Sequence, residues 1–376
     1  MSDFVSGVVG KFSFSVTWIF AAAVATGAGS VFLLPTAARL GFLGQVTRLP
    51  AAASVLFFTL VVTAVGMVMG IVSTPLYQLL EGYKGWPRSF RRMGLERQRR
   101  RLCALQEELD ELEDGEELEV QLLLDRLSHY PTDEDQIAPT RFGNAMRALE
   151  MYGFDHYQLD SLTLWSELYA VVPKSVQDEV AGSRVGIDFF VAMFYLTFAY
   201  GLAAIGLFVV EAVHDPHRID PALLIEGLVV LFVGPLISYR GAISATDYYA
   251  STVQAMVNLG RPKLAEALSL NMPSSLAEER IRMWDVLRLF VNEPDNGEAI
   301  DILDTFRAGA RKRSAAWRLL HGHRRPALQT ARVRARTCVV TPSSVTSSRR
   351  AAVLMKQAAE TVSAPDRPGR QWDHVG

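Results

Sequence analysis

Few side chains in this sequence have the type and spacing that chemistry requires, and the clearest group surrounds Thr140. Thr140 is a typical helix N-cap, which places Arg141 and Asn144 in the first turn of the predicted helix. Free backbone N–H groups there favour a negative charge, so Arg141 and Asn144 could face an anion or a partner. The alternative is structural: Thr140 caps the helix and Arg141 pairs with Glu150 or Asp160. We favour this alternative, because an unpaired Arg is unfavourable at the positive end of a helix.

One carboxylate, Glu226, lies inside the last long apolar run of the chain. An ionisable residue within a membrane span is by default a candidate proton or cation site. A rise of about 1.5 Å per residue from Pro221 puts Glu226 only about 7–8 Å deep, however. At that depth its side chain can extend outward to water. Both interpretations stay open.

Metal and cofactor sites are not expected. Side chains that could bind zinc gather between two apolar runs, but only two of them are His and none is Cys: Glu211, His214, Asp215, His217 and Asp220. Cys103 and Cys338 lie far apart, and neither has a His or Cys at metal-ligand spacing. The sequence has no Gly-rich phosphate loop, zinc-protease motif, nucleophile elbow or kinase motif. We therefore expect no catalytic residue and no cofactor, and do not expect an enzyme.

Four apolar runs must position whatever site exists, and they cover residues of about 14–34, 52–74, 187–210 and 221–238. Each is long enough to cross a bilayer as a helix. The first run is longer than the apolar part of a signal peptide and is read as an uncleaved span. We predict an all-α integral membrane protein with two transmembrane hairpins, residues 1–74 and 187–240. In the second span, Gly66 and Gly70 permit close helix packing, although such pairs also occur by chance.

A dense block of basic residues follows the second run and sets the orientation. Its members outnumber the single Glu96: Lys84, Arg88, Arg91, Arg92, Arg97, Arg99, Arg100 and Arg101. By the positive-inside rule this side is cytoplasmic, which also places both termini in the cytoplasm of a cell-membrane protein. Arg residues beside a span are best interpreted as an anchor for anionic lipids, since each such charge gains about 1 kcal/mol near an anionic surface. Nucleic-acid binding is not expected.

The remaining chain is predicted to be helical, with a basic tail. Residues 75–186 form a cytoplasmic insert, which includes a helix pair or one bent helix after the Arg block, and residues 241–308 form further cytoplasmic helices. The tail from 309 to 376 should be disordered, because it has no apolar period and the stretch from 307 onward carries 15 Lys or Arg against 3 acidic residues.

Several helix ends can be predicted from single residues. Gly153 should close the helix that begins at Thr140, and Pro262 should begin a short helix. Ser275 and Glu278 form a capping box, and a weak helix is expected over residues 298–308.

Three stretches resemble those of an uncharacterised family of bacterial multi-span membrane proteins. They are TPLYQLLEGY (74–83), PTRFGNAMRALE (139–150) and YQLDSLTLWSELYAVVP (157–173). The family pattern has a Leu-Glu-Gly-Tyr element, a Pro-Thr-Arg-x-Gly-Asn element and a Tyr-Gly-Leu-Asp element ahead of a Trp-containing helix. Gln158 stands where that pattern usually has Gly. The resemblance implies the two-hairpin architecture and brings no reaction, ligand or catalytic residue with it.

These observations favour a non-enzymatic membrane protein that acts as an interaction or signalling scaffold at the cytoplasmic face. Its partner would be a second copy of the chain or an unknown protein, in addition to anionic lipids. The alternative is a subunit of an oligomeric channel or transporter, with Glu226 on the transport path.

Overall fold

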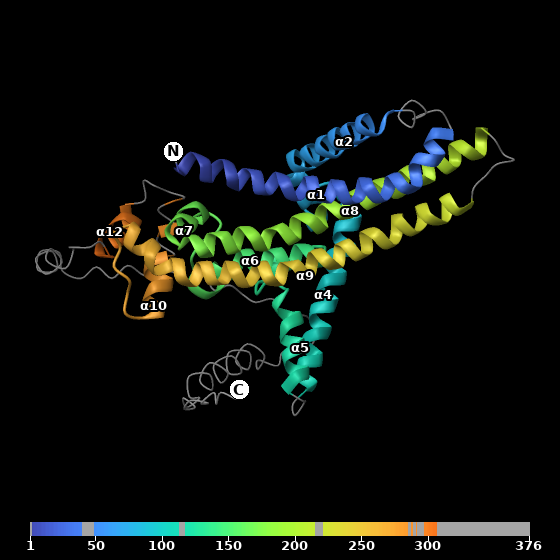
Figure 1. Cartoon of the computed structure of the whole chain (residues 1–376). Coiled ribbons are helices and arrows are strands. Elements are labelled where there is room, and N and C mark those ends of the chain that lie inside the picture. The colour runs from blue at the N-terminus through green and yellow to red at the C-terminus, as the bar shows by residue number, and fades with distance from the viewer. Residues whose placement is uncertain are drawn as a thin grey trace, which may run out of the picture. The chain divides into compact units, whose positions relative to one another are not determined.

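The computed structural model describes residues 2–39, 49–112, 117–214, 221–284, 287–288, 291 and 297–306, and every regular element in these ranges is a helix (Figure 1). The chain divides into two compact units. Unit 1 contains Met1–Leu102 and Leu124–Gly322, and unit 2 contains Cys103–Leu123 and His323–Gly376. The all-α fold class is therefore confirmed for the described part. The tail predicted to be disordered and the link that carries Asp215, His217 and Asp220 lie outside the described residues.

Among the described residues, three helices are long and apolar enough to cross a membrane: α2 (Ala51–Ile71), α8 (Lys174–His214) and α9 (Pro221–Ala267). The first apolar run lies in α1 (Ser2–Arg39). This helix is bent by 54° between Val16–Val31 and Leu33–Arg39, and it makes a fourth candidate if both pieces count as one span. The membrane character predicted from the sequence is thus supported by length and composition.

The second span ends earlier than predicted. Helix α2 stops at Ile71, and a separate helix, α3 (Ser73–Glu81), follows. Pro75 explains the break, because it has no N–H to donate and its ring clashes with the carbonyl group four residues earlier, that of Ile71. The predicted end at Thr74 is therefore wrong by about one helical turn.

Helices α8 and α9 are much longer than the spans they contain. They have 41 and 47 residues, which correspond to about 60 and 70 Å, whereas the apolar layer of a bilayer is about 30 Å thick. The predicted boundary at Gly186 lies inside α8, and Pro262, predicted to begin a new helix, lies inside α9. Packing explains the continuity: Pro235 of α9 is buried, and Gly260 packs against Leu168 and Val172.

A seam of small residues joins α8 to α9. Gly227, Gly234 and Gly241 of α9 face Ala204, Thr197 and Phe190 of α8, in that order. A Cβ added at any of these glycines would lie 2.5–2.9 Å from the facing side chain. Both sets are spaced by seven residues and run in opposite directions, so the helices are antiparallel with a coiled-coil repeat. Such close approach is typical of helices packed in membranes.

Helix α1 packs on both α2 and α8. A Cβ at Gly66 would lie 2.6 Å from Ile19 Cα, so the close approach predicted for Gly66 is confirmed. On the other side, the hydroxyl of Tyr200 donates a hydrogen bond to Thr26 Oγ1 over 2.8 Å. The helix that packs against Gly66 of α2 is therefore α1.

Beyond the spans, shorter helices pack on the extension of α9: α6 (Arg141–Tyr157) and α7 (Trp165–Val171). Figure 1 shows both beside α9. We call α6, α7 and the part of α9 from 242 onward the helical layer. Gly153 does not end α6 as predicted, because it is buried against the carbonyl of Leu159 inside the helix.

The C-terminal helices follow the capping box that the sequence predicts. Ser275 Oγ accepts a hydrogen bond from the Glu278 N–H over 3.2 Å, at the start of α10 (Leu276–Glu278). The π-helix η3 (Glu279–Trp284) follows directly, and α12 (Gly297–Phe306) confirms the last predicted helix. Glu279 fixes η3 to α9, since it accepts bonds of 2.6 and 2.7 Å from Arg261 and one of 2.8 Å from Trp284 Nε1.

The Arg block opens helix α4 (Arg88–Glu111), which is followed by α5 (Glu117–Ser128). These are two helices, the first of the two alternatives predicted for this stretch. Among the described residues of unit 2, the buried apolar residues are Leu105 of α4 and Leu123 of α5.

Candidate functional site

The most polar buried region lies where α3 leaves α2 and meets α6 and α8. Its members are Tyr77, Glu81, Arg147, Glu150 and Asp188, which we call the polar junction. The helices α3, α6 and α8 supply them, and all belong to unit 1.

Two stretches of the family pattern form the frame of the polar junction. Gly82 ends α3 in a left-handed conformation (φ 88°), and a Cβ there would lie 2.3 Å from Pro139. Thr140 donates its hydroxyl to the carbonyl of Glu81 over 3.1 Å and accepts from the Gly143 N–H over 2.9 Å. Gly82 is therefore required for its conformation and its contact, and Thr140 joins the end of α3 to the start of α6.

Asp188 is the buried acid of the junction, with a side chain that is only 3% exposed. Tyr77 donates its hydroxyl to Asp188 Oδ1 over 2.6 Å. Arg184 is the nearest charge, but its Nε lies 3.9 Å from Oδ2 and its side chain is 51% exposed. The short bond from Tyr77 is therefore the main compensation for burying this carboxylate.

Arg147 organises the other half of the junction. Its Nη1 lies 3.1 Å from Glu150 Oε2, and its Nε donates to the Tyr83 hydroxyl over 3.1 Å. The guanidinium also lies 5.4 Å from the centre of the Tyr83 ring, which adds a cation–π contact. Glu81 lies in the field of both Arg147 and Glu150.

The electrostatics of this half favour protonated carboxyl groups. Burial, reinforced by repulsion from Glu150, raises the pKa of Glu81 from 4.5 to about 7, against the attraction of Arg147 and Arg184. Burial also raises the pKa of Glu150, with Arg147 opposing the shift. The pKa of Tyr77 is raised well above its usual value, first by burial and then by Asp188. The junction can therefore take up and release a proton near neutral pH.

The segment 139–144, which the sequence singled out, lies beside the junction. Its side chains Thr140 and Asn144 hold the start of α6 in place. Thr140 caps α6, as the structural alternative predicts. Asn144 is buried, and its Oδ1 accepts from the Ala138 N–H over 2.7 Å. The expected partners of Arg141 are occupied: Glu150 pairs with Arg147, and Asp160 accepts two bonds from Thr163. The N–H of Phe142 already donates to the Tyr239 hydroxyl, so this helix end offers less to an anion than predicted.

Glu226 lies far from this region. It is half-buried in α9, next to Gly227 of the seam, and about 35 Å along the helix from Tyr249, which contacts Arg184. Glu226 and the polar junction are therefore separate features. Among the described residues, no group of three or more His, Cys, Asp or Glu could hold a metal ion.

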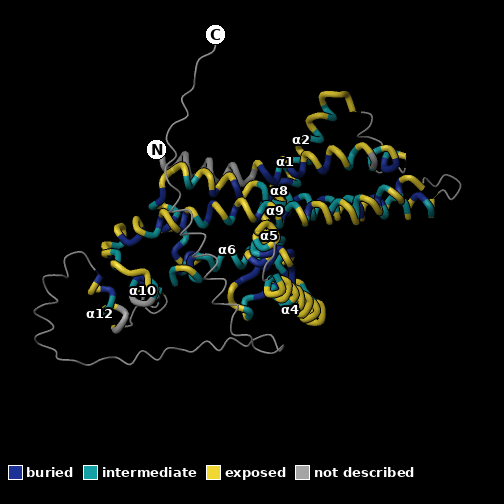
Figure 2. Tube along the Cα trace, turned by 90° about the horizontal axis from the view of Figure 1, so that it is seen from below, coloured by how far each residue is buried: buried dark blue, intermediate teal, exposed yellow. Residues whose placement is uncertain are grey.

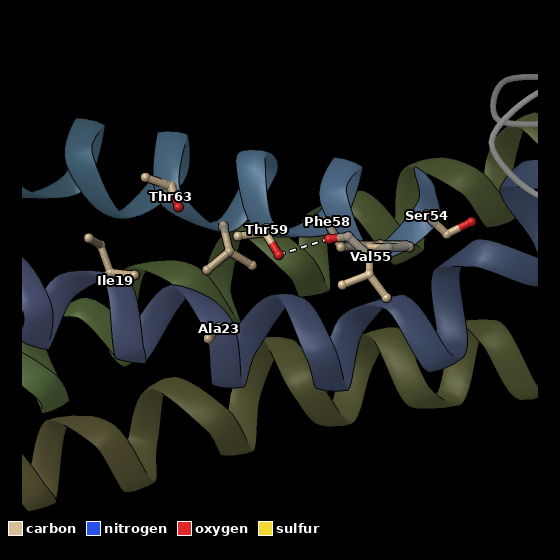
Figure 3. Close-up of a pocket in the computed structure, with 8 residues that line it drawn as sticks. Ile19, Ala23, Ser54, Val55, Phe58, Thr59 and Thr63 are labelled. Atoms are coloured by element: carbon tan, nitrogen blue, oxygen red, sulfur yellow. Dashed lines mark hydrogen bonds between the residues drawn. The ribbon is translucent and has the colours of Figure 1, made fainter. Parts of the chain in front are cut away.

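A shallow groove lies between α1 and α2 (Figure 3). Ile19 and Ala23 of α1 face Val55 and Phe58 of α2, so most of its surface is apolar. The hydroxyl of Thr59 at its edge donates to the Val55 carbonyl over 2.8 Å, within its own helix. The groove suits hydrocarbon and offers no chemistry.

Sequence reasoning missed the partners inside the polar junction. Asp188 lies at the start of the third apolar run, and Tyr77 and Glu81 belong to the TPLYQLLEGY stretch, but neither position indicates that these side chains meet. The usable signal was a carboxylate at the start of the third apolar run, because such a group needs a buried partner. Its partner, Tyr77, lies 111 residues away in the chain.

Gln158 is the C-cap of α6 and has a φ of 60°, the left-handed conformation that glycine adopts most easily. Its side-chain amide donates to the Phe154 carbonyl over 3.2 Å, which partly offsets the strain. The chain matches no known family model, no curated protein and no solved structure.

Proposed function

We propose that this protein is a non-enzymatic membrane scaffold that transmits or receives signals through its helical layer. One observation carries the proposal: α9 continues without a break from an apolar span into the layer, where α6 and α7 pack on it. A change in the membrane part of α9 is then directly a change in the surface that a partner would contact. The polar junction adds a proton-sensitive contact where the span and the layer meet.

The topology belongs to the same proposal. Four spans would form two transmembrane hairpins in the cell membrane, with both termini and the helical layer in the cytoplasm. The basic residues that follow α2 support this orientation. Green fluorescent protein at the C-terminus should fluoresce, and alkaline phosphatase placed between 214 and 221 should be active outside. The opposite pattern would reverse the topology.

Relationship to the bacterial multi-span family is also part of the proposal. Two of the three stretches that carry the resemblance frame the polar junction, and the third ends α6. This clustering is what a shared structural element would produce.

The scaffold proposal is tested by crosslinking from the layer in cells. The photoreactive residue p-benzoylphenylalanine at Tyr248 or Leu259 of α9, both large and exposed within the layer, should form an adduct with one defined protein or with a second copy. The same residue at exposed Glu107 of α4, outside the layer, is the control and should give no adduct. A lone monomer in native mass spectrometry, with no adduct at any position, would contradict the scaffold.

The channel or transporter subunit remains the alternative, and it depends on Glu226. A flux assay in liposomes separates the two proposals, because a transport role requires Glu226→Gln to change the flux. If the protein is a scaffold, neither the wild type nor the Glu226→Gln variant should give any flux.

A further inference from the structure

The start of α4 exposes an unusual pair of side chains. Phe90 is 56% exposed and Met93 is 61% exposed, one helical turn apart. Farther along the same helix, Leu102 and Leu105 are buried. Figure 2 shows the exposed surface of α4. Large apolar side chains next to each other on a charged helix indicate a surface that contacts an apolar partner or a membrane.

The orientation of this surface is fixed by contacts on another side of α4. A Cβ at Gly94 would lie 2.8 Å from the Pro139 carbonyl oxygen, and Gln98 accepts a hydrogen bond of 3.0 Å from the Tyr130 hydroxyl. At 100° per residue, Met93 lies about 100° and 140° from these two positions, and Phe90 lies about 40° and 80° from them. Met93 is therefore turned away from the packed side of α4, and Phe90 lies next to that side but is 56% exposed.

The charges around the pair have one sign. Arg88, Arg91, Arg92, Arg97 and Arg101 are exposed and make no ion pair among the described residues. Arg100 is the exception in the block, since it pairs with Glu96. Five arginines without carboxylates present a strongly positive surface, which an anionic partner would complement.

The chain approaches this surface directly from the membrane. Ile71, the last residue of α2, is highly exposed, and the exposed residues Leu79 and Tyr83 follow before α4 begins. Trp86 holds the turn by donating its Nε1–H to the Leu79 carbonyl over 2.8 Å. Tyr and Trp are enriched where a protein passes through the headgroup region. Exposed apolar and aromatic side chains therefore recur along the chain from the end of α2 to Phe90.

We propose that the first two turns of α4 lie in the headgroup region of an anionic membrane, with Phe90 and Met93 inserted among the lipids and the surrounding arginines bound to lipid phosphates. The apolar pair supplies depth and the arginines supply preference for anionic lipid, as in interfacial amphipathic helices. This inference rests on the membrane location proposed above and names the lipid class that the cytoplasmic face binds. A nucleic acid would use the arginines but would leave Phe90 and Met93 exposed to water.

The test uses the full chain in nanodiscs of phosphatidylcholine with or without phosphatidylglycerol. With p-benzoylphenylalanine at Met93, we expect phospholipid adducts at least about 5-fold more abundant in the anionic discs, the factor that one charge near such a surface provides. The same residue at exposed Leu60 of α2 is the positive control and should label lipid in both discs. At exposed Leu259 of the helical layer, it should label no lipid.

Charge variants complete the design. Arg91→Gln with Arg92→Gln should abolish the anionic preference at Met93, and Arg91→Lys with Arg92→Lys should keep it. Equal labelling in both discs, an adduct with protein in place of lipid, or no adduct at Met93 would each overturn the inference. Normal labelling at Leu60 in those cases would leave the membrane scaffold intact. Loss of labelling at Leu60 would instead contradict the membrane location itself.

Discussion

The seam between α8 and α9 and the polar junction hold the same helix in opposite ways. The seam uses glycines and close backbone approach, with Gly201 so near that a Cβ would lie 2.6 Å from Leu231 Cα. The junction uses buried charge, with Asp188 held mainly by one hydroxyl group. Packing of small residues is insensitive to pH, whereas buried carboxylates are not. Helix α8 therefore takes part both in the closely packed seam and, through Asp188, in the junction with its buried carboxyl groups.

The largest effect should come from breaking the junction. Tyr77→Phe removes the 2.6 Å bond to Asp188 and leaves a buried carboxylate with a distant Arg. We expect the free energy of unfolding to fall by about 3 kcal/mol, as for a buried charge that loses its partner. Titration with SDS in mixed micelles measures the free energy of unfolding of the variant and of the wild type.

Arg184→Gln is the matched control for that prediction. Its side chain is half-exposed and 3.9 Å from Asp188, so losing it, together with its contacts to Tyr249 and the Tyr77 ring, should cost less than Tyr77→Phe. An equal loss in both variants would show that Arg184, and not Tyr77, stabilises the buried acid.

The seam should respond to volume. Gly201→Ala forces α8 away from the backbone of α9 and should cost about 2 kcal/mol through overpacking. Gly206→Ala on the same helix meets nothing within 4 Å and should be neutral or stabilising. Melting temperatures in detergent compare the two. A similar change in both would mean that the seam is not tightly packed.

The junction should make stability depend on pH near neutrality. Glu81 holds its proton more tightly in the folded protein, with a pKa of about 7, than at its ordinary value of 4.5. The free energy of unfolding should therefore fall as pH rises from 4.5 to 7, and then level off. The expected span is about 1–2 kcal/mol, less than the full shift implies because the group is partly solvated.

Glu81→Gln tests that assignment directly. It should flatten the pH profile and raise stability at pH above 7, whereas Gly201→Ala should shift the profile down without changing its shape. A profile that keeps its slope in Glu81→Gln would assign the titration to another group.

The smallest effect should come from Gln158, which lies outside both regions. Gln158→Gly relieves a left-handed conformation but loses the bond to Phe154 and gains chain entropy in the unfolded state. We expect a gain of no more than about 1 kcal/mol. Thermal unfolding measures it, and a clear loss would mean that the side-chain bond outweighs the strain.

The sequence predicts the membrane helices better than it predicts the polar junction. Apolar length predicted the three helices that are long and apolar enough to cross a membrane, and single residues predicted the caps at Thr140 and Ser275, because both signals are local. Breaks at proline were predicted wrongly at Pro262, since packing keeps α9 helical there. The junction could not be predicted, because the residues that make Asp188 and Glu81 tolerable come from distant helices.

The seven-residue repeat of the seam also limits how α8 and α9 can move. A slide of one turn, about 5.4 Å, would replace Ala204 and Thr197 opposite Gly227 and Gly234. Tyr200 and Met193 would arrive in one direction, and Phe208 would face Gly227 in the other. Neither glycine has room for these side chains, so the pair is locked against piston motion. A displacement at the far end of this hairpin therefore reaches the helical layer as a tilt or rotation of both helices together.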